Sequence, residues 1–253
     1  MPTVLLFDID GTLLNAHGAG RRAMEAGFLA ATGRALASFR FAGMTDPAIA
    51  REGLRAAGLL PDGASGPGVE PIVEPGVEPG VEPTQAGLHA QIQAIIESYL
   101  EHLPAQLQAR APRVLPGVRE LLDHLMRTRD GAAVGLGTGN VEAGARAKLR
   151  AAGLDAYFAF GGFGSDHEQR AELLRAGVRR GAARLGVPVS SCRVLVIGDT
   201  PRDVAAAHTI DAECLAVATS HYDVETLRAT RPSEVVSDLR APRARAWLEQ
   251  RLG

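Results

Sequence analysis

The chain has little of several residue types that mark particular protein classes. Only two of its 253 residues are cysteines and no CxxC pair occurs, so we expect neither a disulfide framework nor a cysteine-based zinc site. Aromatic residues make up 4% and the net charge is −2, which excludes the basic, base-stacking surface of a nucleic-acid-binding protein. No apolar run approaches the roughly 18 residues of a membrane-spanning helix, and the N-terminus lacks the pattern of a signal peptide. These absences favour a reducing, cytoplasmic location and no nucleic-acid or membrane partner.

Lysine is nearly absent as well. Lys148 is the single lysine, and arginine carries the rest of the fixed positive charge. A compositional bias toward arginine and alanine accounts for this scarcity, but it leaves few positions for any chemistry that needs an amine.

Four short apolar runs predict buried strands. Helical patterns at Val141–Ala152 and Gln169–Leu185 lie between the last three of them. Strands that alternate with helices predict an α/β fold, a Rossmann-like parallel sheet covered by helices on both faces. The predicted strands are Val4–Phe7, Ala132–Gly137, Val194–Ile197 and Cys214–Ala218.

A long, mostly helical interval separates the first strand from the second. It predicts a helical cap inserted at residues 15–112 into a core made of residues 1–14 and 113–253. Pro112 and the turn Pro116-Gly117 mark the return to the core. The predicted cap helices are Arg21–Ala31, Pro47–Ala57 and Gln85–His102.

The predicted cap contains a low-complexity loop at about residues 61–83. The tetrapeptide GVEP occurs three times, beginning at Gly68, Gly76 and Gly80, with one variant between them. Proline at every fourth position is incompatible with a helix, so the segment is expected to be extended, acidic and exposed. We interpret it as an expanded surface loop, because long loop insertions cost little closure entropy.

Polar residues end or follow three of the predicted strands. Asp8 and Asp10 follow the first, Thr138 and Gly139 the second, and Asp199 and Asp203 the third. The carboxyl ends of parallel strands form the usual ligand site of such a sheet. Two carboxylates about 4 Å apart repel by roughly 4 kcal/mol at an effective dielectric near 20. A hard divalent cation relieves this repulsion, and an all-oxygen ligand set favours Mg²⁺.

These segments together resemble the motifs of the haloacid dehalogenase-like superfamily. Asp8-Ile9-Asp10-Gly11-Thr12 resembles motif I, Thr138 motif II, and Gly198-Asp199 with Asp203 motif IV, in the family's order and spacing. The predicted insertion resembles the family's C1 helical cap. Within the superfamily the chain is most similar to phosphoglycolate-phosphatase-type hydrolases.

The resemblance implies a role for each matching residue. Asp8 would be the nucleophile that forms an aspartyl-phosphate, and Asp10 the general acid and base. Mg²⁺ would be held by Asp8, the Asp10 backbone carbonyl and Asp199, with Asp203 assisting directly or through water. Thr138 and Gly139 would bind the phosphoryl group.

Motif III departs from the family pattern, which commonly has a lysine between motifs II and IV. Lys148 follows motif II too closely for that role, and we expect its replacement by alanine to be mild. Arg170, which opens a predicted helix after a glycine-rich turn, is the best substitute for binding phosphate.

The sequence thus predicts a Mg²⁺-dependent phosphatase that hydrolyses a small phosphorylated metabolite, as a monomer or homodimer. Asp10 disfavours a dehalogenase, which in this family lacks the second acid, and a predicted cap without lysine disfavours a phosphonate hydrolase. Two alternatives stay open: a phosphomutase of the same superfamily, and a non-catalytic regulatory or binding module.

Overall fold

The structure is a computed structural model that describes residues 1–60, 85–128 and 131–252. The GVEP repeat lies outside the described residues. Within them, no helix combines the length and apolar character needed to cross a membrane.

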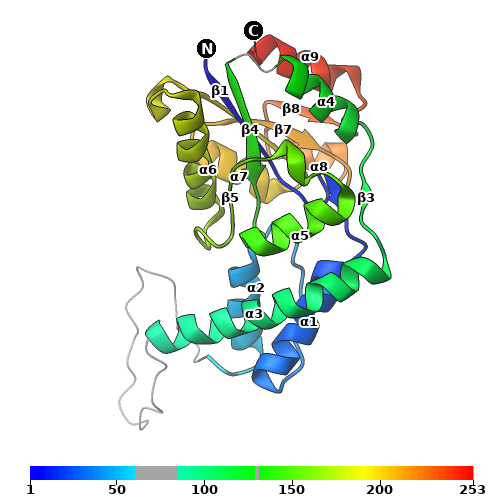
Figure 1. Ribbon diagram of the computed structural model, residues 1–253, viewed down its shortest axis with the longest axis vertical. Helices are drawn as coiled ribbons and strands as arrows, with labels where there is room; N and C mark the ends of the chain where they lie inside the picture. Colours follow the sequence, from blue (N-terminus) through cyan, green and yellow to red (C-terminus); the bar gives the residue numbers. More distant parts are fainter. Residues whose placement is uncertain (61–84, 129–130, 253) are drawn as a thin grey trace.

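A six-stranded sheet, in which every pair of neighbours is parallel, forms the centre of the molecule (Figure 1). Its order is β5-β4-β1-β6-β7-β8, so the first strand lies in the middle. The chain builds outward from β1 on one side and then on the other, which makes β1 and its neighbours the point where strand order reverses. The strands are β1 (Thr3–Phe7), β4 (Ala132–Gly137), β5 (Gly161–Gly162), β6 (Arg193–Gly198), β7 (Glu213–Val217) and β8 (Glu234–Val236).

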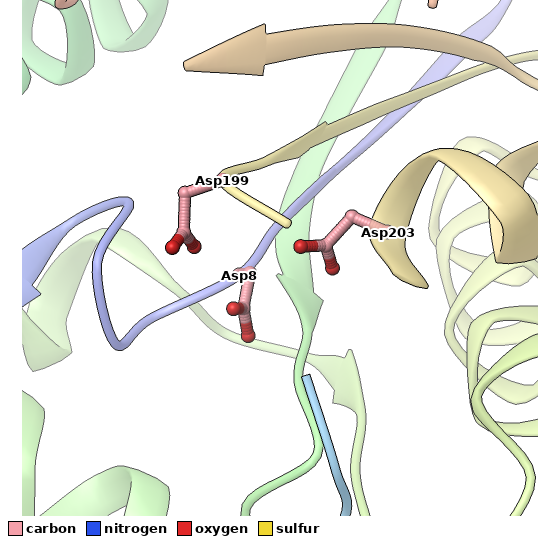
Figure 2. Close-up of side chains that lie close together, drawn as sticks. All are labelled: Asp8, Asp199 and Asp203. Carbon is pink, nitrogen blue, oxygen red and sulfur yellow. The ribbon is translucent and has the colours of Figure 1, made fainter. Parts of the chain in front are cut away.

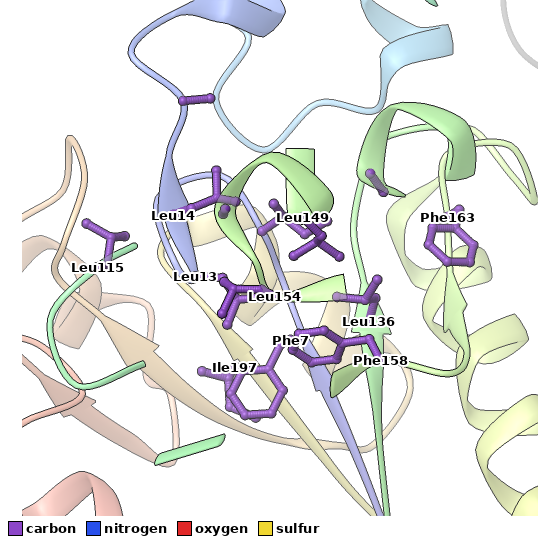
Figure 3. Packing of buried hydrophobic residues seen from close by; sticks show 14 of the residues in the cluster. Phe7, Leu13, Leu14, Leu115, Leu136, Leu149, Leu154, Phe158, Phe163 and Ile197 are labelled. Carbon is purple, nitrogen blue, oxygen red and sulfur yellow. The ribbon is translucent and has the colours of Figure 1, made fainter. Parts of the chain in front are cut away.

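Side chains of β1 alternate between two apolar layers. Leu5 and Phe7 belong to a core cluster with residues of α4, α5 and α9, whereas Val4 and Leu6 belong to a second cluster with α6, α7 and α8. Phe7 meets Phe158 edge to face, with ring centroids 6.0 Å apart (Figure 3). The predicted α/β fold with helices on both faces is therefore confirmed. The core helices are α4 (Val118–Thr128), α5 (Glu142–Ala152), α6 (Arg170–Leu185), α7 (Pro201–Thr209), α8 (Val224–Ala229) and α9 (Pro242–Leu252), with 3-10 turns at Asp155–Tyr157 and Val189–Ser191.

Three further helices lie beyond the carboxyl ends of the central strands, at the opposite end of the molecule from the two termini (Figure 1). We call them the cap helices: α1 (Ala19–Thr32), α2 (Asp46–Ala56) and α3 (Gln85–Ala109). Helix α3 continues past the predicted end at His102 and includes Pro104. Buried Leu103 and Leu107 stabilise this extension against the apolar cluster, which offsets the backbone hydrogen bond that the proline removes.

The chain enters and leaves the cap helices side by side. Strands β2 (Leu14–Asn15) and β3 (Arg113–Val114) form a two-stranded antiparallel ribbon, with Leu14 opposite Val114 and Asn15 opposite Arg113. Pairs this short have no recognisable sequence pattern, and we did not predict them.

Candidate active site

The polar residues that follow the central strands line one cavity of about 670 Å³. Asp8 directly follows β1, Thr138 follows β4 and Asp199 follows β6. Because β1 lies between β4 and β6, these three side chains come from adjacent strands. The cap helices and the loop before α2 contribute to the wall facing them, for example through Arg21 and Met44.

Three buried carboxylates form an acidic cluster, and two of them, Asp8 and Asp199, line this cavity. Asp8, Asp199 and Asp203 each offer a carboxylate oxygen, and these oxygens lie within 4.8 Å of one another (Figure 2). Burial raises the pKa of Asp8 to about 6. The positive charge of Arg170 opposes this increase, and the negative charge of Asp203 adds to it. Burial, followed by the charges of Asp203 and Asp8, raises the pKa of Asp199 well above its usual value. The charge of Asp203 thus makes ionisation of both Asp8 and Asp199 harder.

Arg170 supplies a positive charge to the acidic cluster. It is the first residue of α6, and its side chain is 9% exposed. One guanidinium nitrogen lies 3.0 Å from Asp8 Oδ1 and 2.5 Å from Asp203 Oδ1. The structure therefore brings Arg170, the predicted substitute for the family's lysine, next to the predicted nucleophile. Three carboxylates and one guanidinium leave two formal negative charges at this point.

Both carboxylate oxygens of Asp203 have partners. Its Oδ2 accepts hydrogen bonds from the backbone N–H of Thr200, at 2.9 Å, and from the Thr200 hydroxyl, at 2.7 Å. These contacts belong to the capping box that begins α7. With Oδ2 used in this way and Oδ1 on Arg170, Asp203 is placed to orient the arginine.

Asp199 is oriented by the loop that follows Asp8 and Asp10. The Thr12 hydroxyl donates to Asp199 Oδ1 at 2.9 Å, and Thr12 is fully buried. Gly11 has a φ of +91°, and a Cβ there would lie 2.3 Å from Asp199 Oδ2. Only glycine allows the loop to pass this close to the carboxylate. We did not predict the role of Thr12, although it belongs to the same short motif.

Asp10 lies apart from the acidic cluster and has its own donors. Its Oδ2 accepts from Asn140 Nδ2 at 2.8 Å and from Lys148 Nζ at 2.6 Å, and Lys148 also donates to Asn140 Oδ1 at 2.6 Å. The Asp10 side chain is 42% exposed and lines the cavity.

Lys148, whose replacement by alanine we expected to be mild, contacts one of the predicted catalytic residues. It is too early in the chain for motif III, but α5 carries its amine back to Asp10. A signal for this was in the sequence, because Ala145, Leu149 and Ala152 form the buried stripe of α5 and Lys148 falls on the same stripe. A lysine on the apolar side of a helix needs a buried partner.

Thr138 and Gly139, the predicted phosphate-binding residues, both line the cavity. Thr138 is fully buried, and its Oγ1 accepts from Asn140 Nδ2 at 2.9 Å. Because that contact uses the hydroxyl as an acceptor, its proton remains available to a group in the cavity. Gly139 lines the cavity, and its carbonyl accepts from the backbone N–H of Asp46 at 2.8 Å.

The start of α2 is fixed on the core at this point. Thr45 caps the helix by accepting from the Ala48 N–H, and its hydroxyl lies 3.0 Å from the Glu168 carbonyl as a donor. Asp46 Oδ2 accepts from the N–H of Val141 at 2.9 Å. Burial raises the pKa of Asp46 to about 6, an effect that the positive charge of Lys148 opposes. The segment before α2 is thus both a helix cap and part of the cavity wall.

A family model described as haloacid dehalogenase-like hydrolase matches residues 2–211. Solved structures also resemble the chain. A hydrolase from Pseudomonas syringae is 22% identical, with a TM-score of 0.63 and 94% of each chain covered. CbbY from Rhodobacter sphaeroides, in complex with phosphate, is 18% identical, with a TM-score of 0.62 and 95% of this chain and 96% of that chain covered. A predicted phosphoglycolate phosphatase from Haemophilus somnus 129PT is 16% identical, with a TM-score of 0.60, covering 99% and 98%. At these identities the structural similarity shows a shared fold alone. A search of curated proteins found no match.

Proposed function

Because the chain belongs to the haloacid dehalogenase-like hydrolases, we propose that it is a phosphatase that hydrolyses a small phosphate monoester through an aspartyl-phosphate on Asp8. The observation that carries this proposal is the position of Asp8, which shares one cavity with a second acid, a buried arginine and a threonine. Those groups are Asp10, Arg170 and Thr138.

The acidic cluster fits a divalent cation of the magnesium type. Its carboxylate oxygens are close together and buried, and after pairing with Arg170 they keep two formal negative charges. Oxygen donors alone suit Mg²⁺. Asp8, Asp199 and the backbone carbonyl of Asp10 would hold the ion, whereas Asp203 would act through Arg170 or a water molecule. Bound there, Mg²⁺ would neutralise charge on the phosphoryl oxygens beside the nucleophile.

The first step transfers the phosphoryl group to Asp8. A carboxylate oxygen of Asp8 attacks phosphorus while the bond to the ester oxygen breaks, and Asp10, in its acid form, gives its proton to that oxygen. Arg170 and the Thr138 hydroxyl stabilise the charge on the transferring group. The products are the free alcohol and an aspartyl-phosphate.

The second step returns the enzyme to its starting state. Asp10, now a carboxylate, takes a proton from a water molecule that attacks phosphorus, and the bond to the Asp8 oxygen breaks. Inorganic phosphate leaves, and Asp10 keeps the proton for the next cycle. The same carboxyl group thus serves as acid and then as base.

The cavity limits the substrate to a small molecule. It is bounded by the strand ends on one side and by cap residues such as Phe41 and Met44 on the other. We propose a small phosphorylated metabolite whose leaving group contacts these cap residues. Water exclusion by such a wall favours phosphoryl transfer to the protein over leakage to solvent.

The test measures release of inorganic phosphate from 4-nitrophenyl phosphate and from a panel of sugar and carboxylic-acid phosphates, with Mg²⁺ and with a chelator. We expect turnover by the wild type with Mg²⁺ and only background from Asp8→Asn. Asp10→Asn should accumulate protein carrying one phosphoryl group, because loss of the base slows the second step. Rapid quenching and intact-protein mass spectrometry detect that species.

Three outcomes would contradict the proposal. Turnover by Asp8→Asn near the wild-type rate would remove Asp8 as nucleophile. Conversion of a phosphate ester into an isomer without phosphate release would indicate a phosphomutase. Binding of phosphate and Mg²⁺ without turnover across the panel would indicate a regulatory module.

A further inference from the structure

Lys148 is the only lysine in the chain, and the proposed chemistry gives it no role. Its side chain is 5% exposed, although a buried ammonium is costly unless it is paired. It has two partners, Asp10 Oδ2 and Asn140 Oδ1, each at 2.6 Å. Asn140 in turn donates to the same Asp10 oxygen. The three side chains therefore form a closed triangle of hydrogen bonds.

This triangle uses only one oxygen of Asp10. Oδ2 takes both donors, whereas among the described residues no hydrogen-bond donor is found for Oδ1. Two donors on one oxygen limit rotation of the carboxyl group, and charge-assisted bonds such as that from Lys148 are the stronger kind. Since Asp10 lines the cavity, the restraint leaves Oδ1 as the oxygen able to meet a ligand.

Residues of two cap helices also act on the ammonium. A Cβ at Gly20, in α1, would lie 3.1 Å from Lys148 Nζ, so the amine packs against bare backbone at that point. Asp46, at the start of α2, adds a negative charge that stabilises the ammonium, as Asp10 does more strongly. Lys148 is thus bonded to Asn140 and Asp10, packs against α1 at Gly20, and is stabilised by the charge of Asp46.

We propose that Lys148 is a positioning residue that, together with Asn140, holds Oδ2 of Asp10 so that Oδ1 is presented to the leaving oxygen of the substrate. The inference rests on the proposed function, because it assigns the oxygen through which Asp10 acts. It also explains why a chain with a single lysine keeps it on the apolar side of α5.

The first test compares leaving groups, because help from a general acid matters more for a poor leaving group than for a good one. We would measure kcat/KM, which reports transfer to Asp8, with 4-nitrophenyl phosphate and with an alkyl phosphate, for wild type, Lys148→Met and Lys148→Arg. Lys148→Met should lower kcat/KM for the alkyl ester by roughly 10- to 100-fold more than for the aryl ester, as part of the 10²- to 10⁴-fold that a general acid contributes. Lys148→Arg should recover part of that difference.

A second test observes the contact without turnover. Protein labelled with ¹⁵N-lysine gives one side-chain ammonium resonance, since the chain has one lysine. In metal-free protein, Asp10→Asn and Gly20→Ala should each shift this resonance or broaden it through faster exchange with water. Asp123→Asn, which changes an exposed carboxylate bonded to Tyr157, should leave it unchanged.

The results separate the two proposals. If Asp8→Asn is inactive but Lys148→Met slows both esters by the same factor, the positioning role is wrong and the phosphatase assignment stands. If Asp10→Asn does not move the ammonium resonance, the contact does not exist in solution and the inference fails. If Asp8→Asn keeps wild-type turnover, the phosphatase mechanism fails first, whatever the resonance shows.

Discussion

Arg170 is the residue that we propose in place of the family's usual lysine. Its guanidinium contacts two carboxylates at once, Asp8 and Asp203, and the Thr200 contacts fix the second of these. The same guanidinium nitrogen makes both contacts, so the other N–H groups of the planar fork are left for further acceptors. Asp203 therefore positions Arg170 beside Asp8.

We predict that Arg170→Ala lowers kcat/KM for 4-nitrophenyl phosphate by roughly 10²-fold or more, the size of effect seen when a charge-stabilising donor is removed. Arg170→Lys should keep the charge and recover part of the activity. Steady-state kinetics checks both variants. Arg175→Ala, which removes an arginine half-exposed on the same helix, is the control and should stay near wild type. A loss of only a few-fold in Arg170→Ala would place the phosphate-binding cation elsewhere.

At the residue scale, the site residues that could be predicted were those that directly follow a predicted strand in the sequence. Asp8, Thr138 and Asp199 could be placed because a buried strand followed by a polar residue has one plausible geometry in a parallel sheet. Lys148 and Asn140 could not be paired with Asp10 in this way, since their contact depends on how α5 returns across the cavity. Charge on an apolar helical stripe was the one available signal.

The start of α2 connects a cap helix with the core. The backbone N–H of Asp46 donates to the Gly139 carbonyl, and the Asp46 carboxylate accepts from the N–H of Val141. Two hydrogen bonds therefore fix the start of α2 to the loop after β4. Nearby, Arg51 forms an ion pair with Glu168 at 2.8 Å. Motion of α2 would therefore disturb the loop that carries Thr138.

Asp46 should make stability depend on pH. Its pKa is about 6 in the fold against the usual 3.8, so the folded protein binds a proton between these values that the unfolded chain has lost. The contribution of this group to the free energy of unfolding therefore falls as pH rises from about 4 to 6, and above pH 6 it is fully lost. We predict that the free energy of unfolding of Asp46→Asn, relative to that of wild type, is roughly 2 kcal/mol higher at pH 7.5 than at pH 4.5. The variant keeps an acceptor for Val141.

Urea unfolding at the two pH values measures this difference. Asp123→Asn is the control, because that carboxylate is exposed and its variant should show no comparable pH dependence. An equal effect of Asp46→Asn at both pH values would mean that the carboxyl group is not buried as described.

At the element scale, long patterned segments were predictable and short ones were not. The strands β1, β4 and β6 agree with the predicted runs to within a residue or so, because each is continuously apolar. The two-residue strands β2, β3 and β5 have no period to detect. Pro104 shows that tertiary burial can keep a helix going where local chemistry favours its end.

At the scale of the whole molecule, we expect the acidic cluster to destabilise the fold when no cation is bound. Three buried carboxylates share one arginine, and burial together with the charge of Asp203 raises the pKa of Asp8 and of Asp199. A ligand that binds only the folded state stabilises it by about 2.7 kcal/mol when present at 100 times its dissociation constant. The proposed binding of Mg²⁺ to this cluster would therefore be coupled to folding.

We predict that MgCl₂ raises the melting temperature of metal-free protein and that Asp199→Asn largely abolishes the increase. The increase should be smaller at pH 5 than at pH 7.5, because the pKa of Asp8 is about 6 and protons compete with the cation below that value. Differential scanning fluorimetry against MgCl₂ concentration, with NaCl at matched ionic strength as control, provides the measurement. An identical increase in wild type and Asp199→Asn would place the bound ion outside this cluster.

The ribbon of β2 and β3 has a consequence for engineering the protein. In connectivity, residues 16–112 are the loop of a β-hairpin whose last paired residues are Asn15 and Arg113. A hairpin of this kind can be closed by a two-residue turn such as Asn-Gly. Asn15 could thus be joined to Arg113 through such a turn. The two segments that form the central sheet and its helices would then be one shorter continuous chain. The same junction would accept a different helical insert, so the segment that we propose contacts the leaving group could be exchanged as a cassette while the strand-end acids stay unchanged.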